Sequence, residues 1–331
     1  MRFILNRLGF FFLSLWAAIT INFILPRLMP GNPADIMFAK FQGQLSPQAI
    51  DAMKKAFGLT DKPMITQYFE YLRGLLSGHW GLSFANFPTP VINIIRNILP
   101  WTISLVGLAT VLAVLIGTSA GIYIAWKRQG ILDNTLPLVT MAIQALPYFW
   151  VALLVLFVFG FKLQWFPMNH GYSTDVTSGF NWPFISSALY HGFLPGITIL
   201  LGSLSGWLVG MRNNMINTLG EDYVVFAEAK GVSTRRLMFT YAARNAILPQ
   251  LTSFAIAIGN VVSGSILTEQ VFSYPGIGNQ LTNAVLLEDY PLIQASFLII
   301  AVSVLVANFI VDMLYSRLDP RVRRGGLANE S

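Results

Sequence analysis

Long uncharged apolar runs alternate with short polar segments along most of this chain. Six of the runs reach the length of about twenty residues that a helix needs to cross the hydrocarbon core of a bilayer. The predicted spans are residues 8–26, 101–126, 134–161, 191–211, 246–268 and 290–311. The pattern therefore predicts an all-α membrane protein with six transmembrane helices.

A more polar stretch follows the first span. Within residues 30–100, apolar positions repeat at helical spacing over 46–57 and 65–76, and Gly and Pro separate these runs. This pattern is typical of a small helical domain outside the membrane. We therefore expect an N-terminal transmembrane helix over 1–29, an extracytoplasmic helical domain over 30–100 and a five-helix core over 101–331.

Composition agrees with a membrane protein and excludes several kinds of site. Charged residues make up 11% of the chain, less than half of the roughly 25% usual in soluble domains. The absence of cysteine excludes disulfides and thiolate sites, and His79, His170 and His191 have no metal-ligand spacing. The sequence also lacks the Gly-Lys pair of a phosphate-binding loop. We expect no catalytic residue, metal or cofactor in this chain, so ATP-driven work would need a partner ATPase.

Basic residues in the short loops predict the orientation of the spans. One side carries Arg2, Arg7, Lys127, Arg128, Arg212, Lys230, Arg235, Arg236, Arg244, Arg317, Arg321, Arg323 and Arg324. Because cytoplasmic loops are enriched in Lys and Arg, this side and both termini should face the cytoplasm, and residues 30–100 and 163–190 should face outward. The net charge of +6 is accordingly interpreted as topogenic charge, without a role in nucleic-acid binding. The first run lacks a signal-peptide cleavage site, so we expect it to remain as a span.

The stretch 221–249, inside the predicted cytoplasmic loop 217–249, is a charged interlude with the pattern helix, break, helix. Gly231 can end the first helix in a left-handed turn, and Ser233 can cap the second. Pro249 opens the next apolar segment. Periodicity alone fits an amphipathic connector at the membrane surface, and a more specific interpretation needs the rest of the chain.

This interlude resembles the "EAA" loop of binding-protein-dependent ABC importer permeases. Its letters DYVVFAEAKG…ARNAILP are most similar to those of the first permease in dipeptide, oligopeptide and nickel systems. Further segments match that family in order and spacing: LMPGNPAD at 28–35, GLTDKP…QY at 58–68, GHWGLS at 78–83, VFSYPGIGNQL at 271–281, DYP at 289–291 and VDMLYSRLDPRVR at 311–323. The chain departs from the family at Glu228, where Arg is usual, and at Asn32, where Asp is common.

The resemblance implies the type I ABC importer permease fold in a prokaryotic plasma (inner) membrane. It implies a homologous second permease, two cytoplasmic ATPase subunits that bind ATP and Mg, and an extracytoplasmic solute-binding protein as partners. The first short helix of 221–249 would insert into a groove on the ATPase. The residues expected to couple it are Asp222, Tyr223, Ala227, Ala229, Lys230, Gly231, Arg235 and Arg236.

Two kinds of residue motivate that coupling set. The small side chains of Ala227 and Ala229 would let a partner surface approach closely. Lys230, Arg235 and Arg236 could bind lipid phosphates or acidic groups on the ATPase, or could be plain positive-inside charge.

Polar residues inside two spans are candidates for the translocation path. They are Gln144 and Tyr148 in the third span, and Asn260 and Ser263 in the fifth. Polar side chains at membrane depth usually face a cavity or a neighbouring helix, so lining and packing both stay open. Glu269 falls near a span end, where solvation or an interhelical hydrogen bond is expected.

Two other classes of protein compete with this interpretation. A secondary transporter would need a mid-membrane ionisable group or inverted repeats, and a membrane-embedded enzyme would need paired acids or clustered histidines within the spans. The sequence shows neither pattern. Among cargoes, the resemblance favours peptides, with oligosaccharides and nickel as alternatives.

Overall fold

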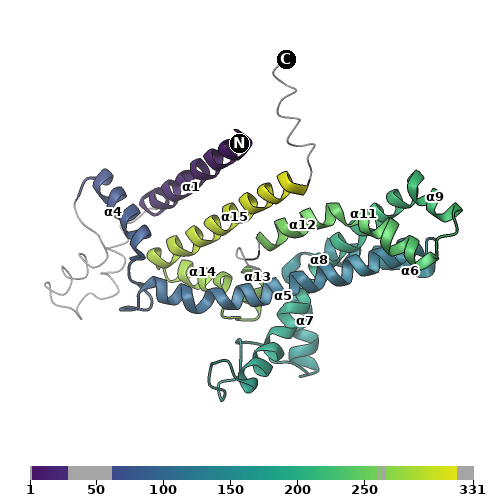
Figure 1. The fold of residues 1–331 in the computed structure, drawn as a ribbon. Helices are drawn as coiled ribbons and strands as arrows, with labels where there is room; N and C mark the ends of the chain where they lie inside the picture. The colour runs from purple at the N-terminus through teal and green to yellow at the C-terminus, as the bar shows by residue number, and fades with distance from the viewer. Residues whose placement is uncertain (1, 29–61, 260, 262–265, 319–331) are drawn as a thin grey trace. The chain divides into compact units, whose positions relative to one another are not determined.

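A computed structural model of the chain describes residues 2–28, 62–259, 261 and 266–318. Within these ranges the regular elements are helices, accompanied by one isolated antiparallel bridge between Leu82 and Pro90 (Figure 1). The predicted all-α fold is confirmed. The chain divides into a terminal unit, Met1–Trp101 with Gly276–Ser331, and a central unit, Thr102–Pro275.

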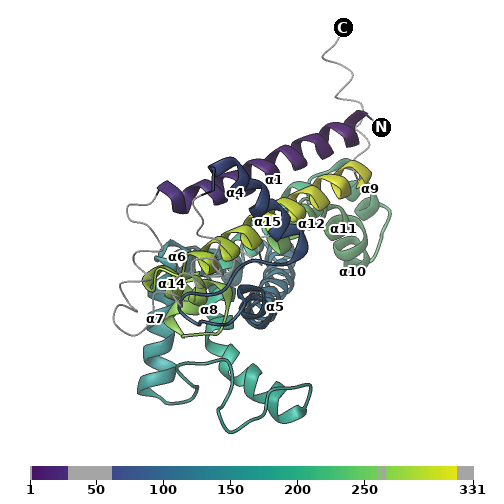
Figure 2. The same cartoon turned by 90° about the vertical axis from the view of Figure 1, so that its left-hand side faces the viewer.

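The terminal unit is built around two long helices. They are α1, Arg2–Leu28, and α15, Tyr290–Leu318, which lie side by side in both views (Figure 1, Figure 2). Asn22 Nδ2 donates to the Gln294 carbonyl at 2.9 Å, and Gln294 Nε2 donates to the Asn22 carbonyl at 3.0 Å. This reciprocal pair fixes the register of the two helices, because neither side chain can shift without stranding a buried amide.

Shorter elements complete this unit. They are α4, Met64–Ser77, the first ten residues or so of α5, Val91–Trp126, and α14, Ile277–Leu286. Helix α4 packs on α1, where the Tyr68 hydroxyl lies 2.8 Å from Thr20 Oγ1. The helix predicted over 65–76 is confirmed, whereas the one over 46–57 lies outside the described residues.

The central unit contains the remaining helices. They are the rest of α5, α6 (Ile131–Ala145), α7 (Tyr148–Val155), the π-helix η1 (Leu156–Lys162), α8 (Trp182–Leu219), α9 to α12 described below, and α13 (Ile266–Val271). Helices α5 and α8 cross tightly at Gly117 and Gly121. A Cβ at Gly121 would lie 2.6 Å from the Leu208 carbonyl oxygen, and one at Gly117 would lie 2.6 Å from Trp207 Cβ. Glycines four apart allow this approach of two backbones, as in membrane helix pairs.

The third predicted span, 134–161, is not one straight helix. Helices α6 and α7 meet at a bend of 99°. Leu146 at the break has φ −73° and ψ 142°, the extended conformation that a following proline imposes on its neighbour. Pro147 also has no N–H to donate to the backbone hydrogen bonds of a continuing helix, so the break follows from the sequence.

Four of the predicted spans have matching helices long and apolar enough to cross a bilayer. The qualifying segments are Arg7–Ile24, Val91–Trp126, Trp182–Leu219 and Tyr290–Ile310, and the bent α6–α7 pair counts as a fifth if it forms one span. The remaining predicted span, 246–268, begins as α12, Leu248–Gly259, and part of it lies outside the described residues. The count of six stays a prediction.

Candidate coupling segment and translocation residues

Helix α9, Asp222–Ala229, ends in a left-handed turn. Gly231 has a φ of 73°. Its N–H donates to the Glu228 carbonyl at 2.9 Å, and the N–H of Val232 donates to the Ala227 carbonyl at 3.2 Å. These two bonds form a Schellman motif, in which a glycine just past the C-cap lets the last carbonyls be satisfied. The predicted stop at Gly231 is confirmed.

The chain beyond this turn is helical but irregular. It runs through α10 (Thr234–Arg236), the π-helix η2 (Leu237–Ala243) and α11 (Arg244–Ala246) into α12. Ser233 occupies the predicted N-cap position, yet its side chain makes no capping hydrogen bond. The wide turn of η2 escapes prediction because a search for apolar positions assumes 3.6 residues per turn.

Small residues fasten the second half of this segment to the central unit. Ala242, Ala243 and Ala246 form a buried cluster with Met211 and Met215 of α8. Flexible methionine side chains fill the irregular space that the π turn leaves. A movement of η2 and α11 would therefore displace the α8 side chains that pack against them.

The inner face of α9 packs on the same unit. Val224, Ala227 and Leu237 form a second buried cluster, and Ala227 is only 6% exposed. The expected role of Ala227 as an approach surface for a partner is wrong, because its methyl group is already covered by this chain. Ala229, two residues on, is exposed and remains available.

The outer face of α9 carries exposed apolar side chains that sequence reasoning missed. Val225 is 53% exposed and Phe226 is 66% exposed. The Lys230 ammonium lies 5.5 Å from the centre of the Phe226 ring, a cation–π distance. The sequence did carry a signal. Val224 and Ala227 are three positions apart and so share one helix face, which leaves Val225 and Phe226 on the other side.

The polar residues of the predicted set fall into two groups. Asp222 lies in the first turn of α9, where a carboxylate is favoured by the helix dipole, and Arg235 and Arg236 are exposed. Tyr223 instead has a structural contact, because its hydroxyl accepts a hydrogen bond from Asn245 Nδ2 at 2.7 Å. The structure thus separates an anchoring tyrosine from the exposed charges.

Two of the predicted path residues, Gln144 and Tyr148, lie on either side of the α6–α7 break. Gln144 is exposed near the end of α6. Tyr148 starts α7, and a Cβ at Gly202 of α8 would come within 2.3 Å of its ring, so Tyr148 packs against that glycine. Asn260 and Ser263 lie outside the described residues.

A buried acid lies within α13, the last short helix of the central unit. Glu269 is completely buried and accepts a hydrogen bond from Thr102 Oγ1 of α5 at 2.8 Å. Of the two expectations for this residue, the interhelical hydrogen bond is confirmed. Burial and the nearby Glu269 carboxylate raise the pKa of the Tyr274 phenol above its ordinary value, so this phenol stays neutral and keeps its proton.

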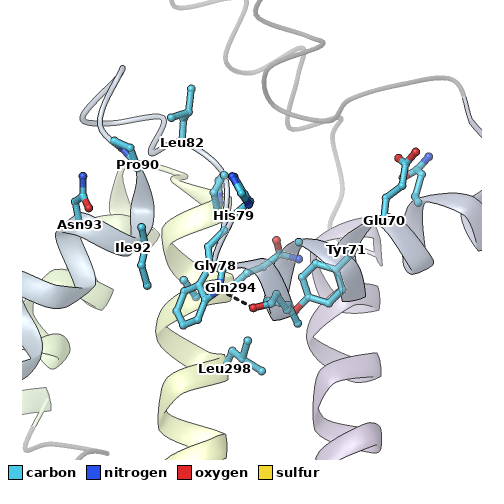
Figure 3. Close-up of a pocket in the computed structure, with 17 residues that line it drawn as sticks. Glu70, Tyr71, Gly78, His79, Leu82, Pro90, Ile92, Asn93, Gln294 and Leu298 are labelled. Carbon is cyan, nitrogen blue, oxygen red and sulfur yellow. Dashed lines mark hydrogen bonds between the residues drawn. The ribbon is translucent and has the colours of Figure 1, made fainter.

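The terminal unit contains a pocket of about 650 Å³ between α4, the loop that follows it and α15 (Figure 3). Its polar lining includes Glu70, Trp80 and Gln294. Glu70 pairs with Lys62, Trp80 Nε1 donates to the Leu75 carbonyl at 3.3 Å, and Gln294 belongs to the α1–α15 pair. These three polar groups therefore already have partners within this chain.

Two family models match this chain, one over its N-terminal part and one over the rest. Residues 117–324 match the model of the family described as binding-protein-dependent transport system inner membrane component, and residues 1–106 match the model of its N-terminal region. The chain belongs to this family of transport permeases. The expected type I permease fold and multi-pass inner-membrane location follow, and the candidate coupling segment, residues 221–249, lies inside the matched region.

Three named relatives are similar to this permease over nearly their whole length. The di/tripeptide transport system permease protein DppB of Pseudomonas aeruginosa is 33% identical over 98% of this chain and 99% of its own. The dipeptide transport system permease protein DppB of Lactococcus lactis is 31% identical over 97% and 99%. The oligopeptide transport system permease protein AppB of Bacillus subtilis is 32% identical over 91% and 93%. The resemblance drawn from the sequence motifs is thereby confirmed.

Proposed function

We propose that the permease forms half of the translocation path of an ATP-driven importer for di- and oligopeptides. Its partners would be a homologous second permease, two cytoplasmic ATPases that hold ATP and Mg, and an extracytoplasmic binding protein. ATP hydrolysis would reside in the partners. The printed functions of the relatives, which are di/tripeptide, dipeptide and oligopeptide transport, support peptides over oligosaccharides and nickel.

The observation that carries the coupling role is the two-sided character of α9. Its inner face is packed on the central unit, whereas Val225 and Phe226 stand exposed beside Lys230. Exposed apolar side chains framed by charge are typical of a protein or membrane contact, and the resemblance of this segment to the ATPase-docking loop favours a protein. We therefore assign this face to the ATPase groove, with Lys230, Arg235 and Arg236 meeting acidic groups at its rim.

Alternating access would be a population shift between inward- and outward-open states, biased by ATP on the motor and by the loaded binding protein. The alanine and methionine cluster of η2, α11 and α8 would transmit the bias to the membrane helices. Gln144, exposed beside the break in the third span, would face the path or the second permease, because an amide at membrane depth needs a polar partner.

Reconstitution tests this function. The tagged permease should co-purify in mild detergent with a second permease and with ATPases, and proteoliposomes of the complex should import di- or tripeptides only with ATP and the loaded binding protein. A permease that purifies alone, or a complex that moves peptide without ATP, would overturn the proposal and favour a secondary transporter.

A further inference from the structure

A partly buried ion pair joins α6 to α8 within the central unit. Asp133, in the first turn of α6, is 5% exposed. Its carboxylate accepts hydrogen bonds from Arg212 Nε on α8 and from the Gln129 backbone N–H, the latter at 3.0 Å. Removing one partner of a buried pair strands the other charge, so this contact resists separation of the two helices.

The pair lies next to the residues of α8 that pack against the coupling segment. Arg212 follows Met211, which packs under the alanines of η2 and α11. Helix α5 also crosses here, because a Cβ at Gly121 would lie 3.0 Å from the Arg212 backbone nitrogen. Helix α8 ends at Leu219, about two turns beyond Arg212, and the chain then enters α9.

A second contact with α8 lies just beyond the other end of α6, at the start of α7. Helix α6 spans fifteen residues, which is roughly 22 Å, and just past its end the Tyr148 ring packs against Gly202 of α8. The ion pair fixes the start of α6 on α8, and the Tyr148 contact fixes the start of α7 on the same helix, so the bend between them is held from both sides. Gln144 lies between the two contacts.

We infer that Asp133 and Arg212 are positioning residues that make α6 and α8 move as one body, carrying a movement of the coupling segment to the bend at Pro147. The inference rests on the proposed function. In this inference the pair acts by keeping Gln144 and the bend at a fixed position relative to α8.

The first test is the coupling ratio of the reconstituted complex, peptide imported per ATP hydrolysed. D133N and R212Q should lower this ratio about tenfold, a middle value for coupling between distant sites, while the complex still assembles. R212K keeps the charge and should recover part of the ratio. K127Q, which removes a cation from the adjacent exposed turn, is the matched control and should leave the ratio unchanged. An unchanged ratio in assembled D133N and R212Q complexes would overturn the inference.

The second test does not depend on how those variants fold. The chain has no cysteine, so spin labels can be placed at I131C and N213C, exposed sites on α6 and α8. The distance between the labels should be the same in the nucleotide-free and ATP-bound complex. A shift of a helical turn, about 5.4 Å, between these states would contradict movement as one body. A complex that neither hydrolyses ATP nor imports peptide would instead contradict the proposed function.

Discussion

The hydroxyl of Ser83 donates a hydrogen bond to the carboxylate of Asp289, which lies 206 positions later in the chain. The same carboxylate accepts backbone N–H bonds from Ala85 at 3.1 Å and from Leu292 at 3.3 Å. Asp289 therefore caps the start of α15 and also holds the loop after α4. Two segments that the sequence comparison treats as separate motifs, GHWGLS and DYP, meet at this one buried acid.

Replacing Ser83 tests that junction. S83A should lower the free energy of unfolding by about 1–3 kcal/mol, because a buried carboxylate loses one of its donors. D289N should cost at least as much, and the double variant should cost less than the sum of both, since the two residues share one interaction. Thermal denaturation of the purified complex, followed by size-exclusion chromatography, measures this. Additive losses would show that the residues act independently.

Gly231 offers a test of the turn after α9. A Cβ there meets nothing within 4 Å, so any penalty comes from the left-handed backbone, which costs an L-residue roughly 1–2 kcal/mol and is least tolerated by β-branched side chains. G231V should insert in the membrane but hydrolyse ATP without matching import. G231N, which tolerates positive φ, is the control and should stay coupled. Normal import per ATP in G231V would remove the turn from the mechanism.

The crossing of α5 and α8 predicts a sharp contrast between two glycines. G121A places a methyl group 2.6 Å from the Leu208 carbonyl oxygen, whereas a Cβ at Gly206 meets nothing within 4 Å. G121A should destabilise the protein by about 1–3 kcal/mol through overpacking, and G206A should have little effect. The midpoints of thermal unfolding of the two variants measure this difference. Equal midpoints would mean that α5 and α8 separate easily enough to accommodate the methyl group.

Local chemistry made much of the fold predictable. The stop at Gly231 follows from the tolerance of glycine for positive φ, and the membrane helices follow from uninterrupted apolar runs. The bend at Pro147 also has a local cause, although span length alone treats residues 134–161 as one segment. Each of these features is decided by residues that are adjacent in the sequence, so the sequence alone is enough to predict it.

Tertiary choices could not be predicted in the same way. Ala227 and Phe226 are adjacent in an eight-residue helix, and only the packing of α9 on Leu237 decides that the alanine faces inward and the phenylalanine outward. The partners of Glu269 and Asp289 come from segments 167 and 206 positions away. Periodicity does not state which distant residue meets a buried acid.

Photo-crosslinking at position 226 tests the central claim most directly. Phe226 would be replaced by benzoyl-phenylalanine in the assembled complex, and Leu76, which is 92% exposed on α4, would receive the same probe as a control. Ultraviolet irradiation should join the permease to an ATPase subunit from position 226 and not from position 76. Adducts with lipid alone at position 226, in a complex that contains the ATPases, would show that α9 is only a surface connector and would contradict the coupling role.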